Sequence, residues 1–140
     1  MVVRSKPQEF AVAMDRGSAL SIAGIRPLET PDGWTPEHLL LAALSRCSAA
    51  SLGFHATRAG LRVSVAVAAR GTVTRREADG RHAVTHIDLE MTVEVDPAPS
   101  TTDLAALLEN AERDCFIGAS LASAPRYAWT INRAVESGEN

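Results

Sequence analysis

A long, mostly apolar segment between Leu39 and Ala59 constrains the fold of this chain more than any other feature. Thr35 and Pro36 before it are typical of a helix start, and Gly60 after it is typical of a helix end. We therefore predict one helix from Pro36 to about Ala59, with about 24 residues and a length of roughly 36 Å. Its leucines surround more than one face, which predicts a central helix that a sheet covers.

Polar side chains interrupt this apolar segment, and they bear on whether it could lie in a membrane. A bilayer core strongly disfavours charged and strongly polar residues. We therefore expect a buried helix of a soluble protein, and no membrane span. The interrupting residues are Ser45, Arg46, Ser48, Ser51, His55 and Arg58.

Two later segments alternate apolar and polar residues, which is the pattern of β-strands with one face in water. They are residues 61–69 and residues 86–95, and Asp79 and Gly80 between them are typical turn residues. We predict a long antiparallel hairpin. The inward residues of its second strand would be Ile87, Leu89, Met91, Val93 and Val95.

The remaining elements are shorter and follow from local patterns. Ser100 is a typical N-cap for a second helix, and the apolar stripe of that helix includes Cys115. Together the elements predict an α+β fold in a single domain over residues 1–140. The other predicted elements are a hairpin over residues 10–14 and 19–23, a loop over 25–34, and a last strand over 127–131.

The charge balance and the length exclude several classes of function. The 140 residues include 14 Lys and Arg against 17 Asp and Glu, for a net charge of −3. Without a cationic surplus we expect no nucleic-acid binding by bulk charge and no binding to an anionic membrane. A chain of this length folds without disulfides or a structural metal. The N-terminus has no secretion signal, so we expect a cytoplasmic protein with reduced thiols.

The two cysteines, Cys47 and Cys115, are the candidates for chemistry. Neither belongs to a Cys-x-x-Cys motif or stands at zinc-ligand spacing from a histidine, so we expect no metal site. His55 follows Cys47 by about 12 Å along one helix, which excludes a Cys–His catalytic pair. Judged by pattern alone, both cysteines are more often small core residues than reactive ones. We predict surface positions for the histidines, His38, His55, His82 and His86.

The helix start and the spacing of the cysteines resemble the OsmC/Ohr family of thiol-dependent hydroperoxide reductases. The resemblance rests on a Pro-Glu pair at the start of the central helix, a cysteine ten residues after the Glu, and a second cysteine about 65 to 70 residues later. Here these positions are Glu37, Cys47 and Cys115. The resemblance implies an OsmC-like α+β fold, in which antiparallel β-sheets wrap around the long central helices of an intertwined homodimer.

The resemblance also implies a peroxidase that reduces organic hydroperoxides. Cys47 would attack the peroxide and become a sulfenic acid, and Cys115 would resolve that acid as a disulfide. An external dithiol reductant, for example a lipoylated protein, would restore both thiols without a bound cofactor. The family activates its reactive cysteine with an arginine that is salt-bridged to the helix-start Glu37. We favour Arg26 for this role, with Arg16 as the alternative.

Glu37 would need a second subunit to act at such a site. Ten residues of helix separate it from Cys47 by about 15 Å. It would therefore serve the site of the other chain in a dimer, or it would only complete the helix N-terminus. The sequence also departs from many relatives beside Cys47. They have a small residue before this cysteine and Phe after it, whereas Arg46 and Ser48 flank it here.

Two other functions stay open. A non-catalytic protein of the same fold would bind a small apolar ligand at the dimer cleft, with both cysteines as packing residues. An acyl-thioester enzyme of the hotdog type would also wrap a sheet around a long helix. It ranks last, because the middle of the predicted central helix carries no carboxylate or histidine.

Overall fold

The computed structural model describes residues 7–133 of the chain. The chain divides at Thr35 into two compact units, which are described one after the other. The prediction of a single domain over residues 1–140 is not decided by this division and stays a prediction.

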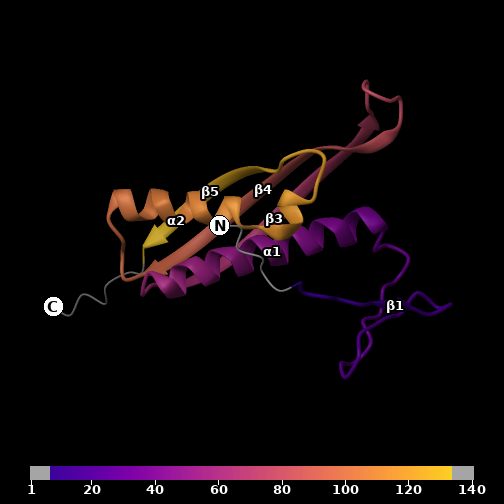
Figure 1. The fold of residues 1–140 in the computed structure, drawn as a ribbon, viewed down its shortest axis with the longest axis horizontal. Coiled ribbons are helices and arrows are strands. Elements are labelled where there is room, and N and C mark those ends of the chain that lie inside the picture. The colour runs from indigo at the N-terminus through magenta and orange to yellow at the C-terminus, as the bar shows by residue number, and fades with distance from the viewer. Residues whose placement is uncertain (1–6, 134–140) are drawn as a thin grey trace. The chain divides into compact units, whose positions relative to one another are not determined.

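Two short antiparallel strands, β1 (Ala13–Met14) and β2 (Leu20–Ser21), form the sheet of the N-terminal unit (Figure 1). The Asp15 carboxylate shapes the turn between them by accepting hydrogen bonds from the backbone N–H groups of Gly17 and Ala19, at 2.8 and 3.0 Å. This confirms the predicted hairpin, although its strands are shorter than the alternating pattern suggests. The segment after β2 is irregular, as predicted, with one isolated bridge back to β2.

The second unit begins with the long helix α1 (Pro36–Arg58), which confirms the predicted helix. Gly60 has a left-handed φ of 75°, and the Leu61 N–H bonds back to the Ala56 carbonyl at 2.8 Å, which closes the helix end. The buried side chains of α1 lie along one face. The buried residues of α1 are Leu44, Ser48, Ser51, Leu52 and Ala56.

Length and composition alone would also allow α1 to cross a bilayer. Its buried face, however, carries two serines. The Ser51 hydroxyl donates a hydrogen bond to the Ala111 carbonyl at 2.7 Å, and Ser48 bonds to groups of the site described below. Such polar contacts with neighbouring elements are typical of a core helix.

A long antiparallel hairpin of β3 (Arg62–Arg75) and β4 (His82–Asp96) packs against α1. It confirms the predicted hairpin and extends it at the turn, where Gly80 has a left-handed φ of 70°. The inward side chains of β4 are at most 2% exposed, which confirms their prediction as core residues. They are Ile87, Leu89, Met91, Val93 and Val95.

The next helix, α2 (Thr101–Arg113), begins at its predicted N-cap. The Ser100 hydroxyl oxygen accepts a hydrogen bond from the Asp103 N–H at 3.1 Å. A short helix, α3 (Phe116–Ala119), follows, and β5 (Arg126–Arg133) completes a sheet with the order β3-β4-β5.

The direction of β5 corrects the prediction of purely antiparallel sheets, because β5 runs parallel to β4. Parallel neighbours need a long crossover connection, and the segment with α2 and α3 supplies it. α1 packs against β3, α2 and α3, so that the helices of this unit lie on one face of the sheet (Figure 1). The core lies between these two layers.

Candidate active site

The fold brings Cys47 and Cys115 together. Cys47 lies in the middle of α1, and Cys115 lies just beyond α2, where it is the N-cap of α3. Each sulfur accepts a backbone hydrogen bond from the start of α3. The Ile117 N–H donates to Cys47 Sγ and the Gly118 N–H donates to Cys115 Sγ, both at 3.4 Å. Each thiol shifts the pKa of the other, so the two sulfurs are neighbours, and neither is in a disulfide.

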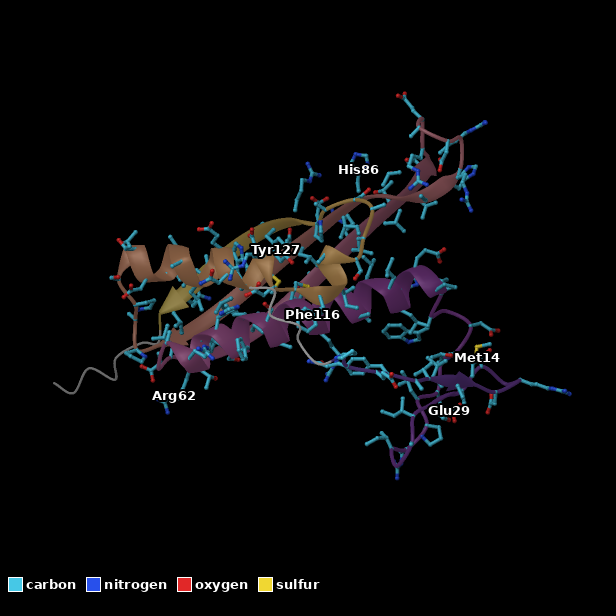
Figure 2. All side chains as sticks on the ribbon, viewed as in Figure 1. Met14, Glu29, Arg62, His86, Phe116 and Tyr127 are labelled. Atoms are coloured by element: carbon cyan, nitrogen blue, oxygen red, sulfur yellow. The ribbon has the colours of Figure 1, made fainter. Side chains whose placement is uncertain are left out.

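Two hydroxyl groups extend this site behind Cys115. Ser48 Oγ lies 3.5 Å from the Cys115 sulfur and 3.2 Å from Tyr127 Oη, and Ser48 is 2% exposed. Figure 2 labels Tyr127 on β5. The role of this pair was not predicted from the sequence. A signal for Ser48 was present, because one helical step after Cys47 turns its side chain by about 100°, toward the core.

Tyr127 is fixed by its neighbours on β5 and α2. Its ring stacks on that of Trp129, with centroids 5.6 Å apart and planes inclined by 7°. The Trp129 indole N–H in turn donates a hydrogen bond to Glu112 Oε1 at 2.7 Å. These contacts hold the Tyr127 hydroxyl at Ser48.

The surroundings of the two thiols change their acidity in opposite directions. Burial raises the pKa of Cys47, with the Ile117 N–H opposing this effect and the adjacent Cys115 adding to it. Burial also disfavours the Cys115 thiolate, but hydrogen bonds from Ser48 and from the Gly118 N–H, together with the neighbouring Cys47 thiol, outweigh this effect and lower the pKa of Cys115. Burial raises the pKa of Tyr127 to about 12, so its hydroxyl keeps its proton at neutral pH. Of the two thiols, Cys115 is therefore the more easily ionised.

An apolar cavity of about 340 Å³ lies beside Cys47. The rings of Phe54 and Phe116 border it and remain 58% and 69% exposed (Figure 2 labels Phe116). Cys115, in contrast, has no exposed surface. A molecule from solution therefore reaches Cys47 first. The lining residues are Cys47, Ala50, Ser51, Phe54, Asp114 and Phe116.

His55 corrects one prediction from the sequence. We predicted a surface residue, but its side chain is only 16% exposed, and its Nε2 lies 2.7 Å from Asp114 Oδ2. The reason is tertiary, because the end of α2 places Asp114 against α1. Arg113 also donates a hydrogen bond to Asp114, at 3.0 Å, and lowers the pKa of that carboxyl. The other three histidines are exposed, as predicted.

The remaining predicted residues lie elsewhere in the chain. Glu37 is exposed in the first turn of α1, and the rise of the helix keeps it about 15 Å from Cys47 of the same chain. Arg26 and Arg16 are exposed residues of the N-terminal unit. The roles of these three residues stay predictions. Between residues 7 and 133, no three His, Cys, Asp or Glu side chains form a group that could hold a metal ion.

The long helix, the sheet that packs on it and the paired thiols at an apolar cavity define a small α+β protein with a dithiol site. The family model for OsmC-like proteins matches residues 29–130, and the chain belongs to the OsmC family. In this fold the apolar α1 is consistent with the core helix of a soluble protein. A search of curated proteins found no match.

Several solved structures share the fold. An OsmC-like protein of unknown function from Vibrio cholerae has a TM-score of 0.66 at 19% identity, over 82% of this chain and 84% of its own. An OsmC-like protein from Mycoplasma pneumoniae has a TM-score of 0.65 at 14% identity, over 93% and 99%. The organic hydroperoxide resistance protein OhrB of Bacillus subtilis has a TM-score of 0.54 at 14% identity, over 87% and 95%. These similarities confirm the predicted OsmC-like α+β fold.

Proposed function

We propose that this protein is a thiol-dependent peroxidase that reduces organic hydroperoxides through Cys47 and Cys115. One observation carries the proposal. The two thiols are neighbours at the start of α3, Cys47 borders an apolar cavity, and Cys115 is shielded behind it. Two-cysteine redox chemistry needs one thiol open to substrate and a second within reach of the first. Organic hydroperoxide resistance proteins among the solved structures of this fold support the proposal.

The proposed reaction has two steps. In the first, the Cys47 thiolate attacks the terminal peroxide oxygen, the O–O bond breaks, and the alkoxide leaves and is protonated to the alcohol. Cys47 becomes a sulfenic acid, oxidised by two electrons. In the second step Cys115 attacks the Cys47 sulfur, the S–O bond breaks, and hydroxide leaves as the disulfide forms. An external dithiol, for example a lipoylated protein, then reduces the disulfide by exchange.

Arg26 and Glu37 complete the proposed site. A guanidinium near Cys47 would favour its thiolate, which burial otherwise disfavours. Glu37 would hold that guanidinium from the other chain of an intertwined homodimer, because it is too far along α1 to serve its own Cys47. Arg16 remains the alternative source of the cation. We place the protein in the cytoplasm, where its thiols are returned to the reduced state.

Titration with one equivalent of cumene hydroperoxide tests the proposal. We expect the loss of both thiols and a mass decrease of two hydrogen atoms per chain, because Cys47 and Cys115 close into a disulfide. Thiol counting and intact mass spectrometry measure both quantities. Retention of both thiols after complete mixing would contradict the proposal.

Phe116→Ala tests whether the cavity binds the organic part of the substrate. The change removes one aromatic wall and keeps the backbone near Cys47. We expect the KM for cumene hydroperoxide to rise about fivefold to tenfold, as for the loss of a partly buried ring, with kcat nearly unchanged. Hydrogen peroxide has no apolar part, so its kcat/KM serves as the control and should stay the same. An equal loss for both peroxides would place Phe116 outside substrate binding.

Binding of a small apolar ligand without catalysis is the second candidate function. The cavity beside Cys47 and the raised pKa of that thiol favour it, because a protonated thiol is a poor nucleophile. The cumene hydroperoxide titration separates the two functions. A ligand-binding protein would keep both thiols, and an alkylating reagent would modify its Cys47 slowly.

A further inference from the structure

We propose that Ser48 and Tyr127 are positioning residues that hold the Cys115 sulfur beside Cys47 and stabilise the Cys115 thiolate that closes the disulfide. The inference deepens the proposed peroxidase function and rests on it for the second reaction step. It assigns a role to two residues that do not contact the substrate cavity. Its first test, given below, requires no peroxide.

The hydrogen bonds around Cys115 carry the argument. Tyr127 and Ser48 form a chain of hydroxyl groups that ends on the Cys115 sulfur, with contacts of 3.2 and 3.5 Å. The Gly118 N–H donates to the same sulfur at 3.4 Å. A buried anion is stable only where such donors replace its lost water. Here several donors converge on a sulfur without exposed surface.

The direction of the hydroxyl chain follows from which groups keep their protons. Tyr127 keeps its phenolic proton at neutral pH and can donate it to Ser48 Oγ. Ser48 has one hydroxyl proton, which is then available to Cys115. The stacking of Tyr127 on Trp129, and the bond from Trp129 to Glu112, fix the start of the chain. The geometry is therefore set before any substrate arrives.

The titratable groups around Cys115 come from three sides. Cys47 faces it from α1, Tyr127 faces it from β5, and Asp114 precedes it in the chain, where Arg113 and His55 hold the carboxylate. Glu112 on α2 adds negative charge near Tyr127. None of these groups is a cation in contact with Cys115, so the anion depends on the hydroxyl and N–H donors.

The proton balance of the reaction agrees with this arrangement. The Cys47 thiolate attacks the peroxide, and the departing alkoxide takes a proton from water and leaves as the alcohol. The Cys115 thiol then loses its proton, and its thiolate displaces hydroxide from the Cys47 sulfenic acid, so that this proton and the hydroxide give water. Over both steps, two thiols and one hydroperoxide give the disulfide, the alcohol and water. The donors around Cys115 stabilise the thiolate that the second step requires.

The first test titrates Cys115 alone, in the Cys47→Ser protein, by the thiolate absorbance near 240 nm. Adding Ser48→Ala should raise the Cys115 midpoint by about one pH unit, the effect of removing one hydrogen bond to a charged group. Tyr127→Phe should raise it by less, because Tyr127 acts through Ser48. Ser45→Ala is the matched control on the same helix, since its hydroxyl bonds to the Leu41 carbonyl, and should leave the midpoint unchanged. Equal midpoints in the Ser48→Ala and Ser45→Ala proteins would overturn the inference.

The second test follows a single turnover at pH 7 with both cysteines present. A one-unit rise lowers the thiolate fraction about tenfold, so Ser48→Ala should slow disulfide closure about tenfold and let dimedone trap the sulfenic acid. The difference in closure rate between the Ser48→Ala and parent proteins should disappear at high pH, where Cys115 ionises without help. A purely structural defect would slow closure at high pH as well. A closure rate equal to that of the Ser45→Ala protein at pH 7 would overturn the role in closure. A protein that does not react with peroxide at all would overturn the proposed function, while the titration would still decide whether Ser48 and Tyr127 hold the thiolate.

Discussion

Cys47→Ser is expected to lower hydroperoxide turnover at least about a hundredfold, to the uncatalysed background. A serine hydroxyl stays protonated at neutral pH, and oxygen cannot form the sulfenic acid through which the two electrons pass. Cys115 cannot replace the lost thiol, because it has no exposed surface and the cavity lies beside Cys47. Peroxide consumption with a dithiol reductant, measured at several enzyme concentrations, checks the result.

Two further variants make this prediction specific. Cys115→Ser should still react once with cumene hydroperoxide and gain one oxygen atom at Cys47, because only the second step is lost. Ser45→Ala should turn over at the parent rate, since its hydroxyl bonds to the Leu41 carbonyl away from the sulfurs. A Cys47→Ser protein that consumes cumene hydroperoxide at the parent rate would refute the proposed mechanism.

Leu89→Ala is expected to lower the free energy of unfolding by about 2–5 kcal/mol. Leu89 lies on the central strand β4, between Ala69 on β3 and Tyr127 on β5, and has no exposed surface. Removing its side chain loses apolar burial and leaves a cavity that strands paired on both sides cannot close. Urea denaturation followed by circular dichroism measures the change, with the slope against urea expected to stay constant.

Leu28→Ala is the matched control for this stability prediction. It removes the same atoms from a residue that is 58% exposed in the N-terminal unit. We expect a change within about 0.5 kcal/mol, as for surface positions in general. Equal losses in the two variants would show that Leu89 does not lie in the core of the folded unit.

The long elements were predictable because their signals are local. The apolar run between Thr35 and Gly60, with its start and stop residues, was sufficient for α1. The strict alternation on β4 was sufficient to identify its buried side chains. Ser100 marked the start of α2 in the same way. In each case the backbone preference and the burial pattern agree within one short stretch of chain.

Contacts between distant segments were not predictable in this way. The parallel direction of β5 depends on how the connection through α2 and α3 returns across the sheet, which no local pattern records. His55 is half-buried because Asp114, far away in the sequence, meets it from the end of α2. Local polarity predicted a surface position, and a tertiary hydrogen bond overrode it.

The sequence by itself determined the α1 helix and the β3–β4 hairpin. It also determined that the two cysteines have an OsmC-like spacing and that the chain has no cationic surplus. Each of these features depends on residue order or composition alone. Only the tertiary structure decided that Cys47 and Cys115 meet at the start of α3, and that one faces a cavity while the other is shielded. It also decided that Ser48 and Tyr127 lie behind the shielded thiol. The acidity of a thiol depends on the groups that surround it in space. Here those groups come from α1, the start of α3 and β5, which only the folded chain brings together.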